Sequence, residues 1–282
     1  MTLTFAAAPE LTADAPRVVE ALRGRGVAVL PVRAQGSALE TLRDGSVNLL
    51  LVSGEAYEEF AKAEDVSAVA VLRREEPRDV FIPAGGRPST LAVLSRGGRV
   101  SVAGARRRGF LLAHRRDLAP VSPRNGGGPA EALRSGTVDA LVLGASEARR
   151  MSLAHLASEA LDSKAWVPSA GQGSLVLLAL AGTPLPEGMD GMDHAASRVA
   201  LAAERACLSA LGGGSDSPLG VLAVPHGRWI RIWGMIASAD GTSVVRGDLT
   251  GDWEDPRHVG EGLAELLLAR GAGSLMDRST RS

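Results

Sequence analysis

The sequence is poor in cysteine, in aromatic residues and in net charge. Its one cysteine, Cys207, excludes a disulfide within the chain and a metal site made of several thiolates. The five histidines are not paired at metal-ligand spacing, so no metal is expected. The formal net charge of −1 gives no overall field to attract nucleic acid or a membrane, so basic residues matter only where they cluster.

Long apolar runs are also missing, because no stretch approaches the ~20 apolar residues that span a bilayer. The start of the chain is weakly apolar, lacks a basic segment and is interrupted by Pro9 and Glu10. We therefore expect a first strand there rather than a signal peptide. These absences lead us to expect a cytoplasmic protein, a monomer without nucleic-acid or membrane partners.

What is present is the composition of a globular protein. Hydrophobic residues make up 45% of the 282 residues and charged residues 22%, which allows two or three domains. Apolar periodicity predicts strands at 3–7, 27–32, 47–52 and 69–73, and helices at 14–23 and 38–43. It then predicts strands at 100–103, 118–121 and 138–143, and helices at 107–115, 129–133, 146–151 and 153–161. The alternation indicates an α/β fold with two similar lobes around a hinge and cleft.

The last third of the sequence has a different pattern. A linker rich in proline and glycine at 183–191 precedes a long helix at 195–211, which ends at a run of glycines. We expect antiparallel strands at 221–224, 229–236 and 242–249 and a final helix at 259–270. This pattern predicts a small α+β domain.

Several short motifs follow one another in a recognisable order. They are RREEPRD at 73–79, the arginine pair at 107–108, LRSGTVDALVL at 133–143, RRM at 149–151, VPSAGQG at 167–173, AERA at 203–206 and GGSDSPLG at 213–220. Together they resemble hydroxymethylbilane synthase, also called porphobilinogen deaminase. The resemblance runs from about residue 45 to residue 268.

The resemblance implies three domains, the first two like the lobes of type II periplasmic binding proteins. Their expected bounds are 1–78 with 174–190, 79–173 and 193–282. Members of the family join four porphobilinogens head to tail and release ammonia, on a dipyrromethane cofactor that a cysteine holds as a thioether. An aspartate stabilises the positive pyrrole nitrogens, and arginines bind the carboxylates of the substrate, as guanidinium groups do well.

The sequence departs from the family at the positions that carry this chemistry. The loop that holds the cofactor cysteine reads Gly213-Gly214-Ser215 here, followed by Asp216, and a serine hydroxyl is a far weaker nucleophile than a thiolate. We therefore expect no dipyrromethane cofactor, and we interpret Cys207 as a core residue. The position of the aspartate holds Ala56.

The arginines partly survive, and acidic residues stand near the altered position. We predict substrate binding by Arg107, Arg108, Arg150, Arg124, Arg149, Ser53 and Gln172. We predict catalytic roles for Glu55, Glu58 and Tyr57, which follow a strand end; an ordinary solvated helix start is the alternative. Arg106 is expected at the surface, and Arg78 with Asp79 is expected to form a structural pair between domains.

Three functions remain open at this point. The first is a repurposed enzyme of specialised metabolism that acts on a small anionic substrate, such as a pyrrole, without polymerising porphobilinogen. The second is a non-catalytic protein that binds such a ligand. The third is an ordinary porphobilinogen deaminase of haem synthesis, which the departures at Ala56 and Ser215 disfavour.

Overall fold

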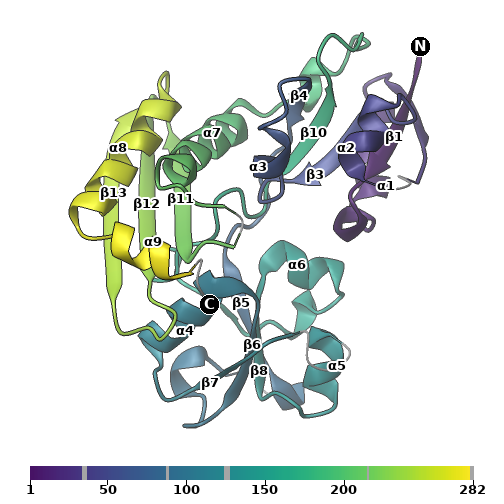
Figure 1. Ribbon diagram of the computed structural model, residues 1–282. Helices are drawn as coiled ribbons and strands as arrows, with labels where there is room; N and C mark the ends of the chain where they lie inside the picture. The colour runs from purple at the N-terminus through teal and green to yellow at the C-terminus, as the bar shows by residue number, and fades with distance from the viewer. Residues whose placement is uncertain (34–36, 87–88, 124–127, 215, 280–282) are drawn as a thin grey trace. The chain divides into compact units, whose positions relative to one another are not determined.

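A computed structural model describes residues 1–33, 37–86, 89–123, 128–214 and 216–279 (Figure 1). The chain forms two compact units. Unit 1 comprises Met1–Glu75 and Gly171–Leu201, and unit 2 comprises Glu76–Ala170 and Ala202–Ser282. The three domain ranges expected from the sequence stay a prediction.

Unit 1 is built on a five-stranded sheet of order β2-β1-β3-β10-β4. The strands are β1 Thr2–Ala7, β2 Ala28–Pro31, β3 Leu49–Ser53, β4 Val66–Val71 and β10 Leu175–Leu180. Strands β1, β2 and β3 pair in parallel, and β10 lies antiparallel between β3 and β4. The helices are α1 Ala15–Arg23, α2 Ala38–Arg43 and α3 Tyr57–Phe60. Helix α2 begins at Ser37, where Ser37 and Glu40 form a capping box.

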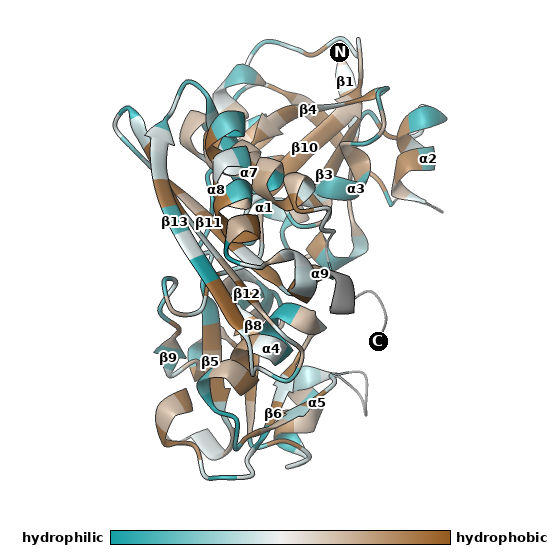
Figure 2. Ribbon diagram, turned by 60° about the vertical axis from the view of Figure 1, so that its left-hand side comes forward, coloured by the Kyte–Doolittle hydropathy of each residue, from teal (hydrophilic) through white to brown (hydrophobic). Residues whose placement is uncertain are grey.

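Both faces of this sheet are covered, because its strands are apolar on both sides. Along β3, Leu49 and Leu51 join one buried cluster, whereas Leu50 and Val52 join the other, as the alternation of side chains in a strand requires. The neighbouring strand β10 is hydrophobic along its length (Figure 2). A strand buried on both faces is typical of α/β proteins.

The first part of unit 2 repeats this design in a sheet of order β7-β6-β8-β5-β9. The strands are β5 Asp79–Pro83, β6 Arg99–Val102, β7 Ala119–Val121, β8 Ala140–Gly144 and β9 Glu159–Ala160. The helices are α4 Gly104–His114, α5 Pro129–Arg134 and α6 Ala145–Arg150. Strand β6 runs parallel to β7 and β8, and β5 is antiparallel to β8. The expected α/β class with two similar lobes is confirmed.

Two segments of this lobe differ from the sequence prediction. The helix expected at 153–161 is replaced by a short 3-10 helix, Ala154–Leu156, and by β9. The backbone of this segment instead pairs with β5, as in the hydrogen bond from Leu161 N to Asp79 O of 2.9 Å. Strand β5 itself was not predicted. The remaining 3-10 helices are Pro9–Leu11, Ala84–Gly86, Leu91–Val93 and Asp190–Met192.

The rest of unit 2 is a three-stranded antiparallel sheet with helices, as expected for the last third of the sequence. Helix α7, Ala195–Ala210, starts in unit 1 and ends in unit 2. The sheet consists of β11 Leu219–His226, β12 Trp229–Ala237 and β13 Val244–Asp252, followed by α8 Pro256–Ala269 and α9 Gly273–Ser279. Helix α8 covers one face of this sheet. The helix packs so closely that a Cβ at Gly234 of β12 would lie 2.7 Å from the side chain of Leu267 on α8.

Candidate functional site

The arginine cluster of α4 is organised by the buried carboxylate of Asp79. Asp79 begins β5 and is 0% exposed. Its Oδ2 accepts hydrogen bonds from Arg106 Nη2 at 2.8 Å and from Trp166 Nε1 at 2.8 Å. Its Oδ1 accepts from Arg107 Nε at 3.1 Å. Burial alone would raise the pKa of Asp79, but the two guanidinium charges and these hydrogen bonds hold it well below its usual range.

Arg107 is held between two carboxylates. Its Nη2 lies 3.0 Å from Asp79 Oδ1, and its Nη1 donates to Glu147 Oε2 at 3.1 Å. Glu147 is in the first turn of α6 and also accepts from the backbone N–H of Gly144 at 3.2 Å. Arg107 is only 8% exposed, so the structure gives this predicted substrate ligand a buried position with its charge already compensated.

The expectation for Arg106 was wrong, because its side chain is buried and only 4% exposed. Besides Asp79, its guanidinium donates to Val167 O at 3.0 Å and lies 5.7 Å from the centre of the Phe110 ring. The expected pair of Arg78 with Asp79 is also corrected, since Arg78 Nη2 bonds Glu76 Oε2 at 2.7 Å. Asp79 instead accepts from the two arginines of α4.

Arg108 has the opposite environment from its two neighbours. It is exposed on α4, and its side chain makes no hydrogen bond or ion pair with the part of the chain that the structure describes. Arg149 is exposed and Arg150 is half-buried, and both have interaction partners. They lie in the last turn of α6, where positive charge interacts favourably with the helix dipole. Helices α4 and α6 follow the carboxyl ends of the neighbouring parallel strands β6 and β8, so their first turns share one edge of the sheet.

The predicted residues of unit 1 lie at the corresponding end of β3. Ser53 ends this strand, and its Oγ accepts from the backbone N–H of Ala56 at 3.2 Å. Glu55 and Tyr57 are half-buried and Glu58 is buried, and all three have interaction partners. These residues therefore lie in one short segment that starts at the end of β3 and continues into α3.

Gln172 lies beside this turn because of a close approach of two glycines. Gly54 N donates to Ser174 O at 2.8 Å, and a Cβ at Gly54 would lie 2.5 Å from Gly171 O. Gln172 is 3% exposed, and its carbonyl accepts from Arg74 Nε at 2.9 Å. Gln172, which was predicted to bind substrate, is therefore a buried residue next to the turn that follows Ser53.

Some predicted positions lie outside the described residues, namely Arg124 and Ser215. Asp216 is exposed. Sequence reasoning missed Glu147 and Trp166 and misplaced Arg106. A usable signal existed: Arg106 and Arg107 stand four positions before the apolar Phe110 and Leu111, so they share the inward face of α4.

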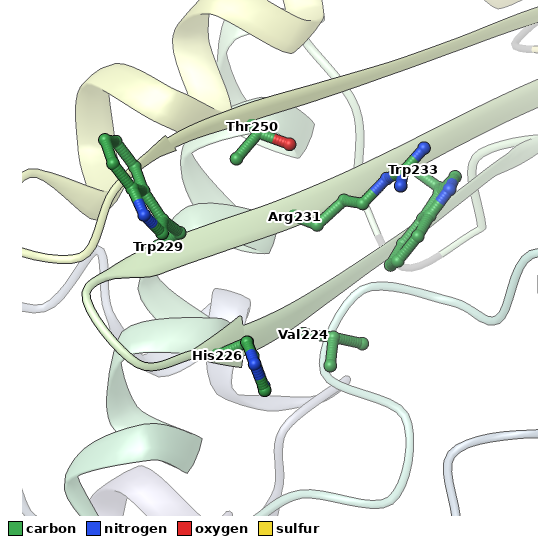
Figure 3. A pocket seen from close by; sticks show the side chains of 6 residues that line it. All are labelled: Val224, His226, Trp229, Arg231, Trp233 and Thr250. Carbon is green, nitrogen blue, oxygen red and sulfur yellow. The ribbon is translucent and has the colours of Figure 1, made fainter.

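A cavity of about 520 Å³ lies on one face of the C-terminal sheet (Figure 3). It is lined by Val224, His226, Trp229, Arg231, Trp233 and Thr250. Arg231 stacks 5.2 Å from the centre of the Trp233 ring and pairs with Asp248 at 3.0 Å. This surface contains none of the predicted site residues, and its one arginine is already paired.

The comparisons with known proteins agree with the motifs. Residues 40–184 match the family model "Porphobilinogen deaminase, dipyromethane cofactor binding domain", and residues 199–269 match that of the porphobilinogen deaminase C-terminal domain. The chain belongs to the porphobilinogen deaminase family. The porphobilinogen deaminase of Roseiflexus castenholzii is 34% identical over 262 residues, which cover 92% of this chain and 83% of the relative. That of Desulforudis audaxviator is 36% identical over 211 residues, 74% of this chain and 68% of the relative.

Similar solved structures include binding proteins. The methionine-binding protein MetQ aligns with a TM-score of 0.45 and 13% identity over 68% of this chain and 88% of that chain. The periplasmic aliphatic sulphonate binding protein SsuA of Escherichia coli aligns with a TM-score of 0.41 and 18% identity over 74% of this chain and 70% of that chain.

The expectation of no cofactor was wrong, because the matched domain of residues 40–184 is itself described by its dipyrromethane cofactor. Cys207 does not fit the role of attachment site. It is 0% exposed on α7, and burial beside Glu204 raises the pKa of its thiol to about 12, so the reactive thiolate is suppressed.

Among the described residues, no group of three or more histidine, cysteine, aspartate or glutamate side chains is placed to hold a metal ion. None of the helices in the described ranges has the length and apolarity that a membrane crossing requires. The cytoplasmic location and the monomeric state stay predictions.

Proposed function

We propose that this member of the porphobilinogen deaminase family is an enzyme that binds a small carboxylate-bearing pyrrole amine and releases ammonia from it. The observation that carries the proposal is the separation of roles within the arginine cluster. Asp79 and Glu147 compensate Arg106 and Arg107, whereas Arg108 stays exposed at the same helix start. Arg108 is therefore the arginine of this cluster that we assign to the substrate carboxylate.

The buried pair then has a positioning role. Arg106 and Arg107 fix the first turns of α4 against β5, and Glu147 extends this connection to α6. Because the guanidinium groups of Arg106 and Arg107 are held in this way, the start of α4 is fixed in position. Arg108 then extends from a fixed point of the helix. Charge-assisted bonds between an arginine and a carboxylate are stronger than neutral hydrogen bonds, so a single well-placed Arg108 can orient an anionic substrate.

The carboxylates of unit 1 are the groups we assign to the reaction itself. When the amino group of an aminomethyl substituent is protonated and leaves as ammonia, the C–N bond breaks and positive charge stays on the pyrrole and its methylene carbon. A nearby carboxylate lowers the energy of that charge until water adds to the methylene carbon and loses a proton. Glu55 precedes Ala56, the N-cap of α3, and Glu58 is the second residue of the helix, so the two carboxylates lie close together in the chain at the end of β3. We assign charge stabilisation and proton transfer to these two residues, with Tyr57 as a hydrogen-bonding neighbour.

A second candidate is a non-catalytic ligand-binding protein. It is favoured by Ala56, which occupies the position aligned with the family's aspartate and offers only a backbone N–H, bonded to Ser53 Oγ. Under this alternative, Arg108 binds the ligand, and Glu55 and Glu58 do not contribute to a reaction.

The test is incubation of the full chain with porphobilinogen, followed by ammonia release and by calorimetric binding. The enzyme proposal expects ammonia release that falls at least about tenfold in Arg108→Gln, because one charge-assisted contact is lost. Arg116→Gln, an exposed arginine just after α4, serves as the matched control and should keep the wild-type rate.

The double variant Glu55→Gln and Glu58→Gln separates the two candidates. The enzyme proposal expects loss of ammonia release with binding retained. Binding without ammonia release by the wild-type protein would establish the second candidate instead. Absence of both binding and release for the wild type would refute both.

A further inference from the structure

A smaller cavity with several charged side chains lies entirely within unit 1, and none of the predicted site residues lines it. Its volume is about 270 Å³. It is lined by α1 and by Arg25 just after it, by the two residues that directly follow β4, and by the residues immediately before α7. The residues that matter for its chemistry are Arg17, Arg25, Arg73, Met192, Asp193 and His194.

Positive charge in this cavity is only partly compensated. Arg17 pairs with Asp14 at 3.1 Å and with Glu75, so its charge is balanced. Asp193 is occupied by Arg198, whose Nη2 lies 2.8 Å away, and this contact and others hold the pKa of Asp193 below its usual range despite partial burial.

Two arginines of the lining have no carboxylate partner. Among the residues that the structure describes, Arg73 makes no hydrogen bond or ion pair, and Arg25 bonds only backbone carbonyls. The cavity therefore has two uncompensated positive charges from segments that are about fifty residues apart in the sequence. Such a pair attracts an anion with more than one negative charge.

Arg25 is already positioned without a ligand. Its Nε donates to Gly191 O at 3.0 Å and its Nη1 donates to Ala21 O at 3.2 Å. A Cβ at Gly191 would lie 3.0 Å from Arg25 Nε, so a larger residue there would displace the guanidinium group. Because the arginine is held by backbone atoms, less conformational entropy is lost when an anion binds.

The floor of the cavity is apolar. Val18, Leu72 and Met192 are all buried. The volume is near the lower end of the roughly 300–1,000 Å³ range of small-molecule sites, so a compact ligand fits best.

We propose that this cavity is a second anion-binding site, which takes a compact multivalent oxyanion, a phosphate or a tricarboxylate, through Arg25 and Arg73. This proposal does not depend on the proposed function, because no residue of the candidate site takes part. Binding would connect α1 to the segment that leaves unit 1 after Glu75 and to the turn that precedes α7.

The test is calorimetric titration of the full chain with inorganic phosphate and, separately, with citrate, at constant ionic strength and without any pyrrole. We expect one site for at least one of the two anions and a rise in the Tm at saturating anion. The double variant Arg25→Gln and Arg73→Gln should raise the Kd at least about tenfold, because two charge-assisted contacts are lost. Both side chains are exposed, so the variant should stay folded.

Two controls make the result specific. Arg33→Gln, an exposed arginine of the same unit, and Arg108→Gln in the candidate site should both leave the Kd unchanged. Gly191→Val should weaken binding, because it displaces Arg25. The proposal is refuted if neither anion binds above the ionic-strength control, or if the double variant binds as the wild type does. An anion that loses affinity in Arg108→Gln but not in the double variant would also refute it, and would place the anion at the candidate site.

Discussion

The substitution Asp79→Asn tests the buried charge cluster most directly. It keeps the shape of the side chain and removes the charge that compensates Arg106 and Arg107. Both arginines are at most 8% exposed, and Arg106 loses the carboxylate that the structure places 2.8 Å from its Nη2. Removing one partner of a buried ion pair costs about 3–5 kcal/mol, because the remaining charge stays desolvated. We expect a loss of that size in the free energy of unfolding at pH 7.

The loss should depend on pH in a defined direction. The folded pKa of Asp79 lies below its unfolded value of about 3.9. A carboxyl group of this kind stabilises the fold at any pH above the unfolded value, and the contribution disappears as the pH falls towards the folded pKa. The difference between wild type and Asp79→Asn should therefore be constant from pH 7 to about pH 5 and become smaller below about pH 4.

Urea unfolding followed by circular dichroism measures this difference. Asp139→Asn is the matched control in the same unit, because Asp139 pairs with Arg99 at 3.0 Å but both side chains are more than 40% exposed. Exposed ion pairs contribute about 0–1 kcal/mol. A loss for Asp79→Asn no larger than that of Asp139→Asn would refute the assignment of Asp79 as the centre of the cluster.

Two further predictions concern residues with steric or chemical restrictions. Gly54→Ala should lower the free energy of unfolding by about 1–3 kcal/mol, because the new Cβ would lie only 2.5 Å from Gly171 O. A Tm equal to that of the wild type would contradict this close approach. Cys207 should not react with a thiol reagent at pH 8 until the protein unfolds, because burial raises the pKa of its thiol to about 12. Rapid labelling of the native protein would show that the sulfur is accessible.

The sequence was sufficient to predict the two lobes but not the contacts of the charge cluster around Asp79. Helix α4, strands β6 and β8 and the C-terminal strands follow from local apolar periodicity, which depends on neighbouring residues. The contrast between Arg106 and Arg108 depends on Asp79, which is 27 positions before Arg106 and joins it only after the sheet has formed. An arginine-rich motif alone therefore predicts an anion site without indicating which arginine is free of internal partners.

Strand β9 shows the same limit for secondary structure. The leucines at 153, 156 and 161 are compatible with a helix, and the local pattern predicts one. The structure forms a strand instead, since residues 159–160 pair with the edge of β5, about 80 positions earlier. Pairing with a distant strand outweighs the weak local preference of so short a segment.

The cluster around Asp79 also constrains the order of events when the chain folds. Asp79 contacts Arg107 on α4 and Trp166, and the last of these contacts closes a loop of 87 positions. Contacts between residues so distant in sequence form late, because closing the loop costs entropy before any contact compensates it. Until a growing chain has emerged from the ribosome past residue 167, Asp79 lacks the N–H of Trp166 as a donor and Arg106 lacks the carbonyl of Val167 as an acceptor. A nascent chain that stopped short of this tryptophan would therefore be a protease-sensitive intermediate, in which the buried charge cluster of unit 2 lacks part of its hydrogen bonds.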